Sequence, residues 1–136
     1  MLRLGYGGVR EFGEEVYLPD TSVIINGVLR RLIVDGRIKG KLLIPKELIQ
    51  HYESLARSGR SIGYVGLEEL RLVKALASSK GVKIDVMSVG RKVQDIDADI
   101  RELALELGAT LVTSSRVQHM AAESLGVKVM YVRPEK

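Results

Sequence analysis

Short apolar runs alternate with longer amphipathic stretches along the chain. A short apolar run bounded by proline, glycine or polar residues is typical of a strand. Apolar residues that recur every three or four positions predict a helix. The first pattern predicts strands at residues 16–18, 41–44, 82–86, 110–112 and 127–132. The second predicts helices at residues 21–35, from Pro45 onward, and at 67–77, 96–107 and 115–125, with a loop at 59–66.

Helix-end signals support several of these boundaries. Pro45 stands where a helix can begin without losing a backbone hydrogen bond. In the helix that follows, Tyr52 belongs to the predicted buried face together with Leu48, Ile49, Leu55 and Ala56. Ser115 is followed three positions later by Gln118, the spacing of a capping box. The helix at 115–125 is therefore expected to begin at Ser115.

Strands separated by helices imply crossover connections between parallel strands. We therefore predict an α/β fold, a three-layer sandwich in which a mostly parallel sheet of about five strands carries helices on both faces. Ligands of such sheets bind beyond the carboxyl ends of the strands. The candidate site residues thus follow the predicted strands, at 20–22, 45–47 and 113–115, together with Asp97 at the start of a helix.

Length and composition favour one globular domain. The chain has 136 residues, of which 46% are hydrophobic, and it contains no cysteine. Residues 1–14 are rich in glycine and are interpreted as a flexible N-terminal arm, and residues 15–136 as the folded domain. No apolar run approaches the roughly 20 residues that span a bilayer, and no signal-peptide pattern occurs. We expect a cytoplasmic protein without a membrane partner.

Basic residues outnumber acidic ones, 21 to 17, which gives a net charge of +4. This balance favours an anionic partner without establishing one, because many domains carry such charge as a solvated surface.

Two aspartates head helices at the predicted rim. Asp20 and Asp97 could each cap free helix amides, which is the ordinary role of such a residue. Carboxylates that converge on one rim can instead hold Mg²⁺ together with water. Asp95, Asp97 and Asp99 are spaced like the ligands of a calcium loop, but Ile100 stands where that loop requires glycine. A phosphate-binding glycine loop ending in Lys-Ser/Thr is absent from the sequence.

Four stretches resemble the PIN-domain family, in particular the PIN domain that begins archaeal PIN-domain ATPases. They are LPDTSVIING at 18–27, IP at 44–45, SGRSIGYVGLEEL at 58–70, and DADIRELA at 97–104 with GATLVT at 108–113 and SRVQ at 115–118. Their order and spacing extend over nearly all of residues 16–132.

The resemblance implies a metal-dependent RNA endonuclease whose site takes acids from four places. Asp20 and Asp97 match two of these acids and are the expected catalytic and metal-binding residues. His51 stands where the family usually has glutamate, six positions after the proline of the second helix, and Ser115 where it usually has aspartate. Asn26 occupies a position that is often aspartate in the subfamily.

Each lost carboxylate removes a negative charge and an oxygen ligand, so binding of Mg²⁺ or Mn²⁺ is expected to be weak or absent. His51 can ligate a softer metal such as Mn²⁺ through its imidazole. Glu47 shares a helix face with His51, four positions away. The possible assisting residues are Glu47, His51, Asp99, Thr113 and Ser115.

Three hypotheses follow. The first is a PIN domain with a partly degenerate acidic site, weakened or inactive as a nuclease and used for RNA binding or assembly. The second is an active Mg²⁺- or Mn²⁺-dependent endoribonuclease. The third is an unrelated phosphoryl-transfer or receiver-like α/β domain that uses Asp20, although Asp20-Thr21-Ser22 lacks the second aspartate expected of a phosphatase loop.

Basic residues near the rim are the expected RNA contacts. Arg101 and Arg116 flank the site segments, and Arg57 and Arg60 lie between the second and third predicted helices. The six aromatic residues are too few for a platform that stacks successive bases, so contact with the RNA backbone is expected to dominate. The resemblance further implies a homo-oligomer and an ATPase domain that follows in a longer protein.

Overall fold

The computed structural model describes residues 15–133, so the predicted arm at 1–14 lies outside the described residues. Within this range, five strands form one sheet in the order β3-β2-β1-β4-β5, and every adjacent pair is parallel. The strands are β1 (Val16–Pro19), β2 (Lys41–Pro45), β3 (Lys83–Met87), β4 (Thr110–Thr113) and β5 (Lys128–Tyr131). The helices are α2 (Thr21–Ile25), α3 (Val28–Val34), α4 (Lys46–Arg57), α5 (Ser61–Lys80), α6 (Ile96–Leu107) and α7 (Arg116–Ser124).

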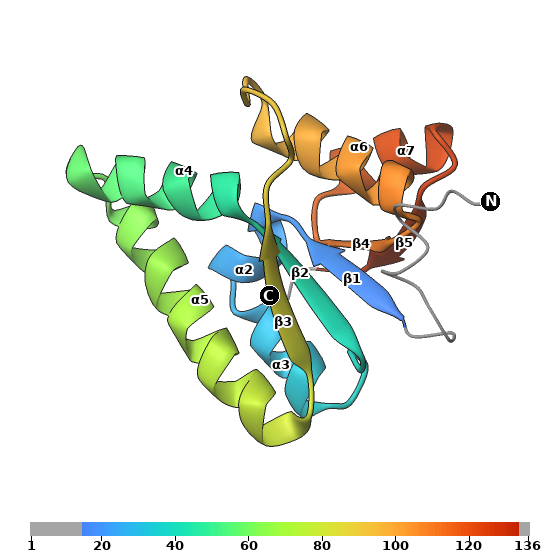
Figure 1. Cartoon of the computed structure of the whole chain (residues 1–136), viewed down its shortest axis with the longest axis horizontal. Helices are drawn as coiled ribbons and strands as arrows, with labels where there is room; N and C mark the ends of the chain where they lie inside the picture. Colours follow the sequence, from blue (N-terminus) through green and yellow to red (C-terminus); the bar gives the residue numbers. More distant parts are fainter. Residues whose placement is uncertain (1–14, 134–136) are drawn as a thin grey trace.

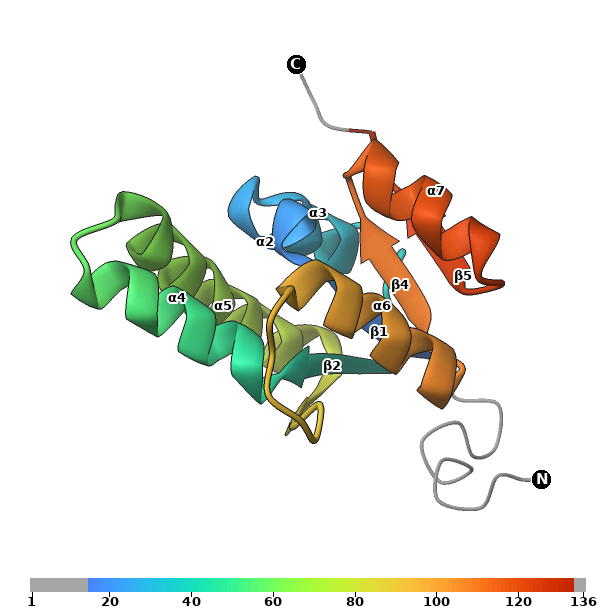
Figure 2. The same ribbon diagram turned by 90° about the horizontal axis from the view of Figure 1, so that it is seen from above.

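The chain crosses the sheet in two directions, and this places helices on both faces. From β1 it moves outward through β2 to the edge strand β3, then returns through α6 to β4 and β5. Because crossovers between parallel strands are right-handed, the two directions put their helices on opposite faces. Helices α2, α3 and α4 all pack on α5, whereas α6 packs on α7 (Figures 1 and 2). The predicted three-layer α/β sandwich is confirmed.

The core lies around the three central strands. β1, β2 and β4 are buried along almost their whole length, whereas the edge strands β3 and β5 are mostly half-buried or exposed. The side chains of Leu18, Leu42 and Leu111, one from each central strand, are fully buried. Among the described helices, none combines the length and apolar character that a membrane span requires.

The predicted helix at 21–35 is wrong in one respect, because it consists of two helices. α2 ends at Ile25 with Asn26 as its C-cap, and Gly27 takes a left-handed conformation with a φ of 80° before α3 begins. The side-chain oxygen of Asn26 accepts a hydrogen bond from the backbone amide of Val28 at 2.9 Å. An Asn-Gly pair therefore interrupts an apolar stripe that is otherwise continuous.

The predicted loop at 59–66 is also wrong, because α5 begins at Ser61 and runs for 20 residues. Gly63 and Gly66 suggested a loop, since glycine costs roughly 1 kcal/mol in a helix interior. Both glycines face α4. A Cβ atom on Gly66 would lie 2.5 Å from the ring of Tyr52, and one on Gly63 would overlap the backbone of Ala56. Close packing of α4 on α5 therefore outweighs the poor helix propensity of glycine.

The contact between Gly66 and Tyr52 yields a prediction about stability. We expect Gly66→Ala to lower the free energy of unfolding by about 1–3 kcal/mol, because an overpacked core forces its neighbours to move. In a Tyr52→Leu background this loss should shrink, since the smaller side chain can give way. Gly63→Ala is the matched control: it meets backbone, so its cost should be the same in both backgrounds. Urea unfolding of the variants measures the coupling, and equal costs of Gly66→Ala in both backgrounds would contradict this account.

Candidate functional site

The side chain of Asp20 is buried where β1 ends and α2 begins. It caps α2, with Oδ1 accepting hydrogen bonds from the backbone amide of Ser22 at 2.9 Å and from its hydroxyl at 2.5 Å. Its other oxygen, Oδ2, accepts from the Thr113 hydroxyl at 2.6 Å. Only 1% of Asp20 is exposed to solvent. Three donors therefore fix the carboxylate in place.

A network of hydrogen bonds from hydroxyl and amide groups connects the end of β4 to this carboxylate. The Ser114 amide donates to the Ser22 hydroxyl at 2.8 Å, and the Ser115 amide donates to the Thr113 hydroxyl at 3.0 Å. Ser115 in turn caps α7 by accepting from the Gln118 amide at 3.2 Å. Ser115, which stands where the family usually has an acid, therefore serves as a helix cap beside the site.

Asp97 comes to the same edge from α6. Asp95, rather than Asp97, caps this helix, so Asp97 lies in the first helical turn. Its Oδ1 atom is buried and has no hydrogen-bond partner among the described residues. Its backbone carbonyl accepts from the Gln118 side chain at 2.9 Å, and the Gln118 oxygen accepts from Arg101 at 2.6 Å. These contacts join α6 to α7 behind the carboxylate.

Burial and neighbouring negative charge disfavour ionisation of the two carboxylates. Burial raises the pKa of Asp97, and the nearby charges of Asp20 and Asp95 raise it further, whereas Arg101 and His51 lower it. Burial also raises the pKa of Asp20, and its hydrogen bonds with Ser22 and Thr113 offset only part of that increase. The pair is therefore a buried, anionic spot that a cation would stabilise.

Tyr52 lies against the acidic pair from α4. Its hydroxyl shares a hydrogen bond of 2.5 Å with the hydroxyl of Thr21, the residue after Asp20. Burial, together with the charges of Asp20 and Asp97, raises the pKa of Tyr52 to about 12. His51, the preceding residue, is exposed but acts on the pKa of Asp97. The middle of α4 therefore contributes one buried phenol and one exposed imidazole to the site.

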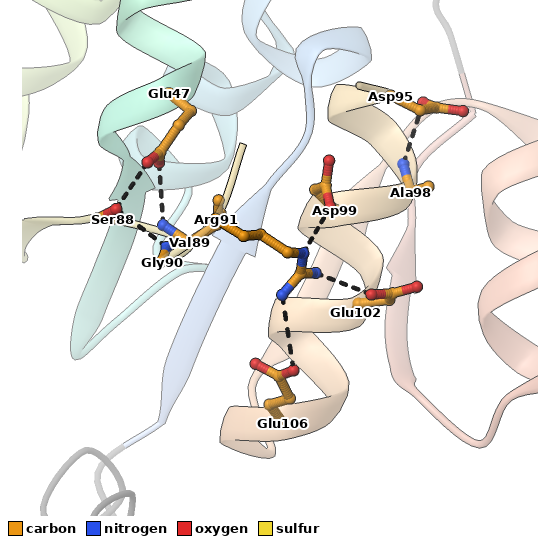
Figure 3. A network of polar contacts seen from close by, with 10 residues as sticks. All are labelled: Glu47, Ser88, Val89, Gly90, Arg91, Asp95, Ala98, Asp99, Glu102 and Glu106. Atoms are coloured by element: carbon orange, nitrogen blue, oxygen red, sulfur yellow. Dashed lines mark hydrogen bonds and ion pairs between the residues drawn. The ribbon is translucent and has the colours of Figure 1, made fainter. Parts of the chain in front are cut away.

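Glu47 and Asp99 make their contacts on the loop between β3 and α6 (Figure 3). The Glu47 carboxylate accepts from the Ser88 hydroxyl at 2.6 Å and from the Val89 amide at 3.0 Å. Asp99 accepts from Arg91 at 3.1 Å, and Glu102 and Glu106 also pair with that guanidinium. Both candidate acids therefore hold the loop that leads into α6 instead of pointing at Asp20.

The four arginines expected to contact RNA have different surroundings. Arg101 donates to Gln118 inside the site, and Arg57 pairs with Glu53 at 3.1 Å. Arg60 and Arg116 are exposed, and neither forms an ion pair with another described residue. The structure therefore leaves Arg60 and Arg116 free to meet an anion and uses Arg101 to position its neighbours.

The donor set at Asp20 and Asp97 fits one divalent cation better than two. Across residues 15–133, no group of three or more His, Cys, Asp or Glu side chains is arranged to hold a metal ion. The unpartnered Oδ1 of Asp97 could contribute one ligand, and Mg²⁺ commonly completes its shell with water. Both oxygens of Asp20 already accept hydrogen bonds, which would weaken it as a ligand.

Two parts of the site were not assigned to it from the sequence. The sequence pattern predicts Tyr52 on the buried face of its helix and Gln118 in a capping box. The backbone of Gln118 does take part in the cap, but its side chain reaches Asp97 and Arg101. An amide side chain on the buried face of α7 was a signal for such an internal contact, because buried polar groups need partners.

Comparison with known proteins yields several relatives, although no protein-family model matches the sequence. An uncharacterized KH and PIN-domain containing protein of Methanocaldococcus jannaschii is 33% identical over 122 residues, which cover 83% of this chain and 19% of that protein. The Holliday junction branch migration ATPase PINA of Sulfolobus acidocaldarius is 26% identical over 119 residues, covering 88% of this chain and 23% of that protein. The chain thus spans about a fifth of the length of these two relatives.

Solved structures extend the comparison. A domain of a functionally unknown protein from Methanocaldococcus jannaschii superposes with a TM-score of 0.80 at 30% identity, covering 90% of this chain and 94% of that one. A PilT N-terminus domain protein from Sulfolobus solfataricus superposes with a TM-score of 0.52 at 20% identity, covering 85% and 86%. The second likeness supports the fold alone.

The raised pKa of Asp97 predicts a pH-dependent effect of removing its charge. The folded state holds the Asp97 proton more tightly than the unfolded state, so ionisation above the ordinary pKa of 3.8 opposes folding. We expect the free energy of unfolding of Asp97→Asn, relative to the parent, to rise between pH 4 and pH 7. The gain should be at most about 1 kcal/mol, since solvent partly screens this half-buried group.

Urea unfolding across this pH range measures the effect. Glu106→Gln, which removes an exposed acid from the same helix, is the control. A pH profile of Asp97→Asn that is parallel to that of the parent would contradict the electrostatic coupling.

Proposed function

Because the chain belongs to the PIN-domain family, we propose that it binds single-stranded RNA at the carboxyl edge of its sheet and cleaves it weakly or not at all. The observation that carries this proposal is that Asp20 and Asp97 lie close enough for their charges to interact, while no group of three or more His, Cys, Asp or Glu side chains among the described residues is arranged to hold a metal ion. The family chemistry uses acids from four places, and close placement of two cations needs their charge. The residues present can neutralise one cation.

The side chains at this site have two proposed roles, contact with a cation and positioning of the acids. Asp97 offers an unpartnered oxygen, and Asp20 adds a fixed negative charge beside it. Ser22 and Thr113 hold Asp20 in orientation, and Gln118 holds the first turn of α6. A Mg²⁺ or Mn²⁺ ion bound there would supply positive charge next to a phosphate of the RNA backbone. The protein itself therefore contributes a positioned anionic spot rather than a complete catalytic set.

Basic groups beside the acidic pair support binding of an RNA backbone. His51 lines an open groove of about 400 Å³ together with Glu47 and with Arg91 and Lys92, which lie on the loop before α6. The Glu47 carboxylate in this groove already accepts hydrogen bonds from Ser88 and Val89. Arg91 is neutralised by the acids of α6, whereas Lys92 is exposed. Exposed cations such as Lys92 and Arg60 would attract phosphates in a salt-dependent manner.

An active endoribonuclease is the second candidate function, and one observation favours it. The buried Oδ1 of Asp97 without a partner is the kind of atom that a bound cation satisfies. A single ion at this point could still lower the barrier to phosphodiester hydrolysis.

We also propose, from the relatives alone, that an ATPase domain accompanies this domain in a longer protein. The Sulfolobus acidocaldarius relative is named as an ATPase, and the chain matches 23% of its length. Self-association stays a prediction from the family resemblance.

Cleavage and binding of labelled single-stranded RNA decide between the two candidates. We expect the parent to bind RNA, with affinity that falls as salt rises, and to show no cleavage in Mg²⁺ or Mn²⁺ beyond that of Asp97→Asn. Glu106→Gln is the matched control for loss of an acid from α6. Cleavage by the parent and by Glu106→Gln that disappears in Asp97→Asn would establish the active nuclease instead. Absence of RNA binding in low salt would refute the proposed function.

Restoring an acid at position 51 should strengthen metal binding. His51 interacts electrostatically with Asp97, so His51→Glu would place a third carboxylate near the pair. We expect Mn²⁺ to raise the melting temperature of His51→Glu by several degrees more than that of the parent, because binding to the folded state stabilises it. His51→Gln, neutral and similar in size, is the control. An equal Mn²⁺ response in parent, His51→Glu and His51→Gln would show that position 51 does not face the metal site.

A further inference from the structure

A second open groove, of about 680 Å³, lies between α7 and the end of β5. Its lining residues are Arg116, His119 and Met120 from α7, with Tyr131 and Arg133 at the end of β5. On α7 the three residues stand three and four positions apart, so they share one helix face. The side chain of Gln118 instead reaches Asp97. α7 therefore separates the acidic pair from this groove and contacts both.

The groove belongs to the same edge of the sheet as the acidic pair. Tyr131 is the last residue of β5 and is aligned with Thr113, the last residue of β4 and a hydrogen-bond donor to Asp20. Adjacent strands lie about 4.8 Å apart, so Tyr131 is one strand further along the rim. A chain of nucleotides laid along this rim could meet the acidic pair and the groove in succession.

The rings in the groove form a flat stacked pair. His119 and Tyr131 have centroids 4.5 Å apart and planes inclined by 14°. Glu123 pairs with the His119 ring at 3.2 Å between Nε2 and Oε2 and so fixes its orientation. Both rings are only partly buried. A planar base can stack on such an aromatic surface, and this contact tolerates any base because every base has a π-face.

Two arginines in this groove form no ion pair with the residues that the structure describes. Arg116 and Arg133 are exposed, and neither forms an ion pair with any residue between 15 and 133. Arg30, Arg71 and Arg91, by contrast, each pair with a glutamate or an aspartate. Unpaired guanidinium groups beside a stacked aromatic pair combine the two chemistries that a nucleotide offers, a phosphate and a planar base.

We propose that this groove binds one nucleotide of a single-stranded nucleic acid, with its base against the Tyr131–His119 pair and its backbone phosphate held by Arg116 and Arg133. The proposal rests on the RNA binding proposed above and adds a base-contacting position to it. An acidic peptide would satisfy the arginines but would leave the rings without a planar partner. The groove thereby fixes the path of the strand relative to Asp97.

An oligonucleotide and its abasic counterpart separate stacking from charge. We expect Tyr131→Leu to weaken binding of a single-stranded oligonucleotide about tenfold and to leave binding of an abasic strand of equal length unchanged. Tyr131→Phe, which keeps the ring, should bind both strands like the parent. Fluorescence anisotropy at fixed salt measures the affinities, and thermal melting checks that each variant is folded.

Charge variants complete the test. Arg116→Gln and Arg133→Gln should weaken binding of both strands several-fold and reduce the salt dependence. Arg71→Gln, a paired arginine on α5, is the control and should have no effect.

The outcomes keep the two proposals apart. If the parent binds neither strand, RNA binding and this subsite both fail. If the parent binds but folded Tyr131→Leu binds equally well, or loses affinity for both strands alike, the base-stacking subsite fails and RNA binding stands. If Tyr131→Leu loses affinity and Tyr131→Phe loses as much, stacking is also refuted.

Discussion

The buried carboxylate of Asp20 connects the two halves of this molecule. β1 pairs with β2 on one side and β4 on the other, so the chain leaves β1 in one direction and returns on the opposite side. Asp20 sits at this point, with its backbone amide bonded to Val112 and its side chain bonded to Thr113. A buried carboxylate is tolerated only when donors surround it, and Ser22 and Thr113 supply them. The same contacts cap α2 and hold the end of β4, so structure and candidate chemistry depend on one group.

The second acid depends on a different set of contacts. Asp97 is carried by α6, whose first turn is tied to α7 through Gln118 and whose entry loop is held by Glu47 and Arg91. These polar contacts on both sides of the loop bring Asp97 to Asp20 despite their separation in sequence. Asp99 and Glu47, which an acid count alone would add to the metal site, are occupied in that positioning. Glu47 and Asp99 therefore help to position Asp97 beside Asp20 but do not join the acidic pair themselves.

Electrostatic repulsion limits how many carboxylates a partly buried site can hold without a cation. Burial raises the pKa of both Asp20 and Asp97, and the charge of Asp20 raises the pKa of Asp97 further. A third carboxylate would add repulsion that only a bound cation could offset. His51 acts in the opposite sense, since it lowers the pKa of Asp97. The histidine at position 51 therefore favours the ionised form of Asp97, whereas a carboxylate there would disfavour it.

The sequence by itself determined the order of the strands and helices, the parallel sheet and the two acids at its carboxyl edge. Each of these follows from a local pattern, such as an apolar run ending at Pro19 or an aspartate heading a helix. The same local patterns wrongly predicted a loop at 59–66. Gly63 and Gly66 are needed there because they let α5 pack closely on α4, a contact that the sequence pattern does not show.

Only the tertiary structure decided which polar side chains share a site. Glu47 and His51 lie on one helix, yet Glu47 bonds to Ser88, whereas His51 lowers the pKa of Asp97 through its charge. Tyr52 and Gln118 reach the acidic pair from positions that a periodicity analysis assigns to the core or to a helix cap. Contacts between these side chains depend on how elements distant in the sequence pack together. The sequence pattern shows the periodicity and the ends of each helix and strand, but it does not show which residue of another element lies opposite.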